Sequence, residues 1–136
     1  EFFKFNLEKE KQTEPTYSLP LTYLYEPNAA ILKAGAFNLI SAQLMVSKLH
    51  KHAHLYTSNN KTEFPGRVFK INSILPSNKK TLKKLDITKA NITTRNFPES
   101  VLQLRKKLNI KDGGDLYLFF TTDLNDTKIM IVCTRI

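Results

Sequence analysis

Short apolar segments and charged connections alternate through the first part of the chain. Phenylalanine occupies three of the positions 2–7, and leucine or tyrosine occupies every second position from 19 to 25, so both segments predict strands. Between them, residues 8–12 alternate in charge and predict a solvated turn or loop. Pro27 after Glu26 predicts a helix start, because proline lacks only an N–H that would have no partner in the first turn.

Two helices are predicted next, over residues 29–34 and 37–49. The first is rich in alanine, isoleucine and leucine, and the second has apolar residues at spacings of three and four. Gly35 lies between them and predicts either a break in the helix or a close packing contact. A short strand or loop follows at residues 54–58.

The second half of the chain has a more regular order of elements. It begins after a polar stretch that ends in Pro65-Gly66, a turn signal, so we divide the chain into segments 1–64 and 65–136. The pattern then predicts a strand, a helix, a strand, a helix and two strands, at residues 67–75, 79–85, 90–97, 98–108, 116–121 and 128–134. The last two strands are apolar on both faces, which is typical of interior strands in a covered sheet. This order predicts an α+β fold, a mixed β-sheet with helices packed on one side.

Composition bears on membrane association, on cellular location and on the role of the cysteine. The 136 residues are 41% hydrophobic, enough for a core, and no apolar run approaches the ~20 residues that span a bilayer, so we expect no membrane partner. The single cysteine, Cys133, fits a reducing compartment and a cytoplasmic location. Cys133 lies in an apolar strand, where desolvation disfavours a thiolate, so we expect a buried core residue. Because the chain begins with Glu1 rather than Met, we expect a fragment of a longer protein.

We predict no catalytic residue and no metal site. The sequence has no glycine-rich phosphate loop and no G-x-S-x-G motif, and its carboxylates are scattered. Glu26 is explained by the stabilisation of a carboxylate at a helix N-terminus. His50, His52 and His54 alternate, and in an extended segment they would face one way and suit zinc or nickel. Carboxylates that would orient such ligands are missing nearby, which favours surface or packing histidines.

Basic residues are the most informative feature of the composition. Lys plus Arg total 21 against 12 Asp plus Glu, a formal net charge of +9, which favours an acidic partner such as nucleic acid. Ten of the 21 lie within residues 79–111, a window with only two acids. We predict that they contact phosphates: Lys79, Lys80, Lys83, Lys84, Lys89, Arg95, Arg105, Lys106, Lys107 and Lys111. Gly113-Gly114 offers backbone amides for the same purpose. The alternative is that these side chains form solvated helix faces.

Two long segments resemble a known family. The first runs YLYEPNAAILKAGAF at residues 23–37 and continues through LH at 49–50, HLYTS at 54–58 and FPGR at 64–67. The second includes ANIT at 90–93, RNFP at 95–98, LRKKL at 104–108 and KDGGDLYLF at 111–119. From about residue 19 to the C-terminus, the chain resembles the C-terminal region of a bacterial family of class I SAM-dependent methyltransferases. This family is best known in Bacteroides-like bacteria, and in it a ferredoxin-like segment precedes a THUMP-like domain.

The resemblance implies a methyltransferase domain before residue 1, with SAM as its methyl donor and no cofactor in the present chain. THUMP domains are RNA-recognition modules of tRNA-modifying enzymes, so tRNA or rRNA is the expected partner, together with the methyltransferase domain itself. We therefore predict a substrate-recognition module without activity of its own. One alternative is a structural module that stabilises the methyltransferase domain without contacting nucleic acid. Another is a domain that binds acidic protein targets.

Overall fold

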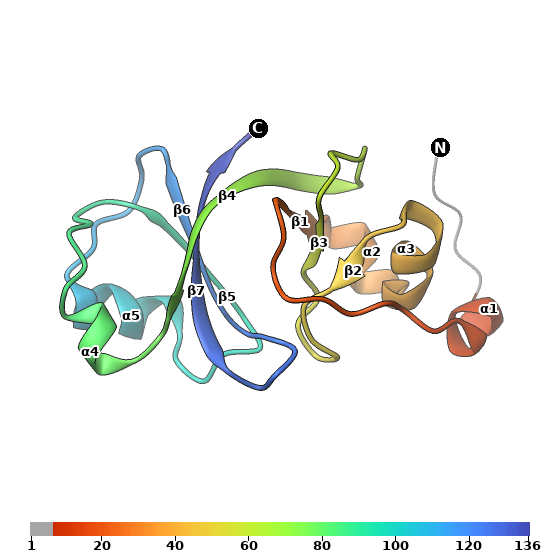
Figure 1. Ribbon diagram of the computed structural model, residues 1–136, viewed down its shortest axis with the longest axis horizontal. Helices are drawn as coiled ribbons and strands as arrows, with labels where there is room; N and C mark the ends of the chain where they lie inside the picture. The colour runs from red at the N-terminus through yellow and green to blue at the C-terminus, as the bar shows by residue number, and fades with distance from the viewer. Residues whose placement is uncertain (1–6) are drawn as a thin grey trace.

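The computed structural model describes residues 7–136 (Figure 1). Five helices and seven strands are formed, in the order α1 (Leu7–Gln12), β1 (Tyr23–Pro27), α2 (Ala29–Ala34), α3 (Phe37–Leu44), β2 (Ser47–Lys48), β3 (Tyr56–Ser58), β4 (Gly66–Pro76), α4 (Lys79–Leu82), β5 (Asn91–Arg95), α5 (Val101–Leu108), β6 (Leu116–Thr122) and β7 (Lys128–Arg135). The strand expected at residues 2–7 lies outside the described residues, except for Leu7, which begins α1. None of these helices is long and apolar enough to cross a membrane.

All seven described strands join one mixed sheet, in the order β2-β3-β1-β4-β7-β6-β5. The pair β5–β6 is parallel and the other pairs are antiparallel, so the predicted mixed sheet is confirmed. Strand β4 is the longest, with 11 residues, and it pairs with β1 over residues 66–70 and with β7 over residues 69–76. The sheet is therefore continuous across the division that we predict at residue 64.

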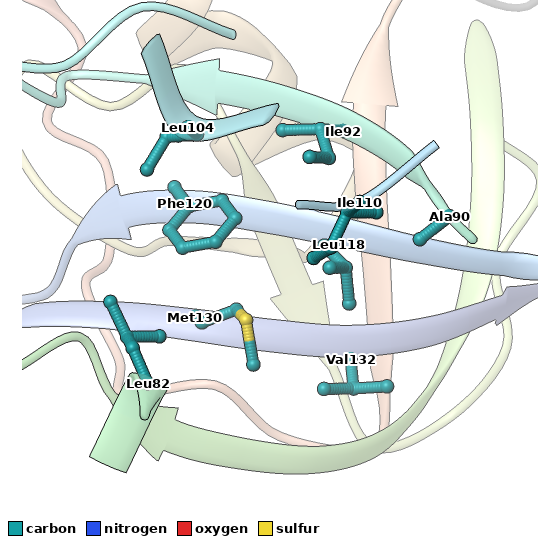
Figure 2. Packing of buried hydrophobic residues seen from close by; sticks show 9 residues of the cluster. All are labelled: Leu82, Ala90, Ile92, Leu104, Ile110, Leu118, Phe120, Met130 and Val132. Carbon is teal, nitrogen blue, oxygen red and sulfur yellow. The ribbon is translucent and has the colours of Figure 1, made fainter. Parts of the chain in front are cut away.

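Helices α4 and α5 cover one face of the C-terminal strands. Figure 2 shows Leu82 of α4 and Leu104 of α5 directed toward Met130 and Phe120 on that face. Helices α2 and α3 pack at the other end of the molecule (Figure 1), where Ile31 and Ile40 join a separate cluster. The arrangement confirms the α+β class with helices against the sheet.

The opposite face of β6 and β7 is also buried, as their apolar pattern predicts. Phe119 on β6 and Ile131 on β7 point away from α4 and α5 and pack against Leu24, Leu49 and Leu55 from the N-terminal half. Each such side chain contributes roughly 1.5–3 kcal/mol when fully buried. The two halves of the chain therefore share a hydrophobic cluster as well as a sheet.

Several predicted boundaries are wrong for local reasons. The segment predicted as a turn at residues 8–12 is helix α1, and its Glu10 caps another helix: the carboxylate accepts hydrogen bonds from the backbone N–H groups of Asn38 and Leu39 at 2.9 and 2.8 Å. This capping compensates for Ala36, which stands at the N-cap of α3 without a side-chain acceptor. Pro27 ends β1 rather than starting a helix, because the side chain of Asn28 caps α2 instead.

The second predicted helix is shorter than its apolar pattern suggests. Helix α3 ends at Leu44, because Met45 adopts a left-handed conformation with φ of 56° and the chain then turns into β2. The break at Gly35 is confirmed, with φ of 73° at the end of α2. Helix α4 ends at Leu82, before the predicted residue 85, and α5 begins after Ser100 rather than at Pro98.

Candidate nucleic-acid interface

A groove of about 370 Å³ separates α4 from α5, and lysines line it. Lys79 and Lys83 come from α4 and its C-cap, Lys107 comes from α5, and leucines form the floor. The side chain of Asn78 accepts a hydrogen bond of 2.7 Å from the N–H of Thr81 and so caps α4. A spacing of four residues puts Lys79 and Lys83 on one face, while Leu82 anchors the helix to the core.

Helix α5 presents its basic residues in a fixed position. Its N-terminus has a capping box, in which the Ser100 hydroxyl accepts from the N–H of Gln103 at 3.1 Å and the Gln103 side chain accepts from the N–H of Ser100 at 2.8 Å. Leu104 is fully buried beneath it. Lys106 and Lys107 stand in the last turn, where a positive charge is favourable. Lys107 also pairs with Glu99 at 3.2 Å, a contact of two partly exposed side chains.

The other two lysines of this region line a second groove, of about 420 Å³, on the side of α4 toward β4. Lys80 and Lys84 border it, with Leu75 of β4 at its base. Leu85 belongs to both grooves. The structure thus brings the four lysines at residues 79–84 to one end of the molecule, divided between two adjoining grooves.

The backbone segments that carry Lys89 and Lys111 are hydrogen-bonded to each other. The N–H of Ala90 donates to the carbonyl of Lys111, and the N–H of Lys111 donates to the carbonyl of Thr88, both at 2.9 Å. The aliphatic part of Lys89 lies against Gly113, where a Cβ would stand 3.0 Å from the Lys89 Cε. Lys89 therefore covers one of the glycines whose amides we expect to face a phosphate.

The two arginines among the ten predicted cations are engaged in the fold. Arg105 donates to the carbonyls of Ala90 and Ile110 at 3.1 and 3.3 Å and pairs with Asp112 at 2.8 Å. Arg95 pairs with the carboxylate of Glu26 at 2.8 Å. The candidate interface therefore consists of the lysines of α4 and α5 rather than these arginines.

Glu26 does not have the helix-terminus role that we predict for it. Its buried carboxylate accepts from the Arg67 Nε at 2.6 Å and from Arg95 at 2.8 Å. Arg67 also lies over the rings of Phe69 and Tyr117, at 5.3 and 5.7 Å from their centroids. The two sequence motifs that contain Arg67 and Arg95 therefore meet at one carboxylate.

The three alternating histidines point to different surroundings. His50 bonds to Asp126 at 2.7 Å, His52 is exposed, and His54 stacks on Phe37 with ring centroids 3.6 Å apart. Burial, with smaller contributions from the positive charges of Lys48, His52 and Arg95, lowers the pKa of His54 to about 4. Within residues 7–136 no three His, Cys, Asp or Glu side chains gather in a metal-binding arrangement.

Cys133 is fully buried in β7, as predicted. Burial raises the pKa of its thiol to about 12, so the thiolate is scarcely formed at neutral pH. The prediction that this cysteine is a core residue and not a nucleophile is consistent with both observations.

Each half of the chain matches a known protein family. Residues 66–135, about half of the chain, match the family described as THUMP domain-like. The chain belongs to the THUMP domain-like family. Residues 23–65 match a second family, described as a ferredoxin-like domain. The order that the resemblance implies, a ferredoxin-like segment followed by a THUMP-like domain, is therefore confirmed, and the α4–α5 groove lies within the THUMP-like part.

A solved structure resembles almost the whole chain. It is a crystal structure described as a "putative methyltransferase" from Porphyromonas gingivalis W83, with 37% sequence identity and a TM-score of 0.93. The match covers 98% of this chain and 34% of the Porphyromonas protein, so the chain spans about a third of that protein's length. A comparison with curated proteins gives no match.

Proposed function

We propose that this chain is the RNA-binding, substrate-recognition module of a bacterial SAM-dependent RNA methyltransferase that works in the cytoplasm. The observation that carries the proposal is the lysine-lined groove between α4 and α5 within the THUMP-like half. The similarity to a protein described as a putative methyltransferase supports the second part of the proposal. The net charge of +9 supports an acidic partner.

The groove suits a phosphate backbone better than a base edge. Lysine is a compact point charge with three donors, and it binds phosphate without reading sequence. Each phosphate that a lysine neutralises releases condensed counterions, which gives a salt slope of about −0.7 to −0.9 per contact. Three contacts, from Lys79, Lys83 and Lys107, therefore correspond to a slope of roughly −2 to −3. The module would position structured RNA, such as tRNA or rRNA, and would not itself transfer a methyl group.

The described residues do not fit SAM. Nucleotide-like cofactors of this class sit against a glycine-rich turn between a strand and a helix. Here Gly35 ends a helix, Gly66 begins β4 after a turn, and Gly113 and Gly114 lie in the loop after α5. We therefore assign SAM to a methyltransferase domain elsewhere in a longer protein and derive no step through it from these residues.

Binding of a fluorescent tRNA transcript, measured by anisotropy at several salt concentrations, tests the proposal. The double variant Lys79→Glu/Lys83→Glu is expected to weaken binding at least tenfold, since it replaces two attractive contacts by repulsive ones. The matched control is Lys33→Glu/Lys61→Glu, which makes the same change in net charge at two exposed positions of the N-terminal half. An equal loss of tRNA affinity in both variants would show that net charge alone is responsible. It would overturn the assignment of RNA binding to the groove. No tRNA binding at low salt would favour the structural module instead.

A further inference from the structure

A pocket separate from the two lysine-lined grooves lies where the two halves of the chain meet. Its volume is about 460 Å³, and three separate segments line it: Tyr17 before β1, residues 50–52 between β2 and β3, and Leu124 and Asp126 in the turn between β6 and β7. Figure 1 shows that turn and the β2–β3 connection converging below the middle of the molecule. In the same view α4 also lies on the lower side, at the left end of the molecule.

Hydrogen bonds hold the histidine wall of this pocket in place. The N–H of His52 donates to the Nδ1 of His50 at 2.9 Å, so the proton of a neutral His50 ring is on Nε2. His50 Nε2 then donates to the Asp126 carboxylate at 2.7 Å and ties the N-terminal half to the β6–β7 turn. Asp126 itself has φ of 60°, and its N–H donates to the carbonyl of Asp123 at 2.9 Å. The carboxylate at the pocket edge is therefore held by both its side chain and its backbone.

Tyr17 also lines the pocket, and its backbone is fixed as well. The backbone of its segment pairs with β2 through two hydrogen bonds, from Ser18 N–H to the Lys48 carbonyl at 3.0 Å and from Lys48 N–H to the Thr16 carbonyl at 2.8 Å. Tyr17 is nevertheless 40% exposed, and Leu124 is 43% exposed. An exposed aromatic ring held on a paired backbone is a surface on which another planar ring can stack.

The chemistry of the pocket fits a nucleotide. The Tyr17 ring and Leu124 supply stacking and apolar surfaces, the exposed Lys51 supplies a cation, and the Asp126 side chain, 83% exposed, supplies hydrogen-bond acceptors. Base–aromatic stacking is a main source of affinity for single-stranded nucleic acid. A carboxylate accepts from the exocyclic amino group of cytosine, adenine or guanine, whereas uracil lacks this group and offers only its ring N3–H. An acidic peptide offers neither a base to stack on Tyr17 nor an exocyclic amino group for Asp126.

We propose that this pocket binds one unpaired, amino-bearing nucleobase of an RNA whose backbone lies on the lysines of α4 and α5. The inference rests on the proposed function, because it takes RNA as the ligand. It adds a position at which the chain distinguishes bases, which the lysine groove alone does not provide. Tyr17 stacks on the base, Asp126 accepts from its amino group, and Lys51 contacts the adjoining phosphate.

NMR titration of the chain with short single-stranded oligonucleotides tests the pocket directly. Pentacytidylate is expected to shift the amide signals of Tyr17, residues 50–52 and Leu124–Asp126, and to bind about fivefold more tightly than pentauridylate, the effect of one hydrogen bond. Tyr17→Ala is expected to abolish these shifts. Asp126→Asn keeps an acceptor for His50 and tolerates positive φ, but it adds an amide donor, so the preference for cytidine over uridine is expected to disappear or reverse.

The failure of this inference can be told from the failure of the proposed function. The Lys79→Glu/Lys83→Glu variant leaves the pocket intact and is expected to retain the cytidine preference, although its overall affinity falls. If neither oligonucleotide shifts the pocket signals while tRNA binding still depends on Lys79 and Lys83, the pocket assignment is overturned and the proposed function stands. Equal shifts from ribose 5-phosphate, or shifts from a glutamate-rich peptide alone, overturn the assignment in favour of a phosphate or a protein ligand.

Discussion

Glu26 on β1 accepts a 2.8 Å hydrogen bond from Arg95 on β5, although β4, β7 and β6 lie between these two strands in the sheet. A flat sheet would hold strands so far apart in its order well out of reach, at about 4.8 Å per step. The sheet must therefore curl until its two distant strands approach each other at one end. The shared cluster with Phe119 and Ile131 lies on the same side of the strands as these charges and fills the curl.

Replacement of Glu26 by glutamine is expected to lower the free energy of unfolding by about 2 kcal/mol. The loss follows because Arg67 and Arg95, each about one-third exposed, would keep their charges without the carboxylate that neutralises them. Urea unfolding measures the effect. The control is Glu99→Gln, which removes a partly exposed pair with Lys107 and is expected to cost at most about 0.5 kcal/mol. Equal effects in the two variants would contradict the role given to Glu26.

Glu10→Ala is expected to destabilise the protein by about 1 kcal/mol, the usual loss on removing a helix cap. The reason is that the N–H groups of Asn38 and Leu39 would lose their acceptor at the start of α3. Thermal unfolding followed by circular dichroism suits this comparison. Glu8→Ala, on the exposed side of the same helix, serves as the control and should leave the transition almost unchanged. A transition that stays in place in Glu10→Ala would show that the cap contributes nothing.

Acid is expected to destabilise the protein through His54. Its pKa is lowered to about 4 in the folded state, against about 6.5 in the unfolded chain, so the unfolded state binds more protons between these values. The contribution of His54 to stability is therefore full above pH 6.5 and falls as the pH drops toward 4. Between pH 7 and pH 4.5 the loss should be about 1–2 kcal/mol, allowing for partial exposure.

His54→Phe is the variant that isolates this effect. Phenylalanine keeps the stacking on Phe37 and removes a buried Nδ1 atom that has no hydrogen-bond partner in the described structure. Urea unfolding at pH 7 and 4.5 is expected to show a shallower pH dependence than in the wild type. His52→Gln, at an exposed position, should keep most of the wild-type slope, because burial is the largest cause of the lowered His54 pKa and the charge of His52 is a smaller one. The same slope in His54→Phe would assign the acid sensitivity to other groups.

Gly66→Ala is expected to be among the most damaging small substitutions in the chain. A Cβ at this position would lie 1.9 Å from the carbonyl oxygen of Glu26, so the pairing of β1 with β4 could not survive unchanged. A loss of about 3 kcal/mol or more is expected from a clash with backbone. Gly35→Ala provides the comparison, because it meets no atom within 4 Å and should cost only the strain of positive φ, about 1 kcal/mol. Similar stabilities for the two variants would contradict this account.

The salt dependence of tRNA binding should change with the lysines that are removed. Wild-type affinity is expected to fall steeply between roughly 50 and 200 mM salt. Lys79→Gln/Lys83→Gln should reduce the log–log slope by about 2, one unit for each lost phosphate contact. Arg105→Gln is expected to act differently, by lowering stability through its lost bonds to Ala90 and Asp112. An unchanged slope in the lysine variant would place the phosphates elsewhere.

The sequence predicts those parts of the fold in which local pattern and tertiary environment agree. Strands β6 and β7 are apolar on both faces, and the structure buries both faces. Their interior place in the sheet therefore follows from their apolar pattern alone. The end of α3 does not, because the apolar run continues past Leu44 while the backbone turns at Met45. Helix propensity favours continuation there, and the pairing of β2 with β3 prevails over it.

The candidate site likewise has a part that the sequence predicts and a part that it does not. A dense run of lysines predicts that α4 and α5 present positive charge, and the grooves bring these lysines together. The roles of Arg95 and Arg105 depend on partners 69 and 7 residues away, Glu26 and Asp112, which no local pattern reveals. The sequence pattern also does not predict the place of Tyr17, because only folding brings it to the same pocket as His50 and Asp126.

Strand β4 determines how the whole molecule can respond to a ligand. Its 11 residues, about 36 Å of extended backbone, join the ladder with β1 to the ladder with β7, with one register shift between Ile71 and Ser73. Neither half can swing away from the other unless one of these ladders breaks. The two halves should therefore move as one body. For the proposed RNA ligand, this would fix the distance along the RNA between the phosphates on the α4–α5 groove and the base in the pocket at the junction of the halves.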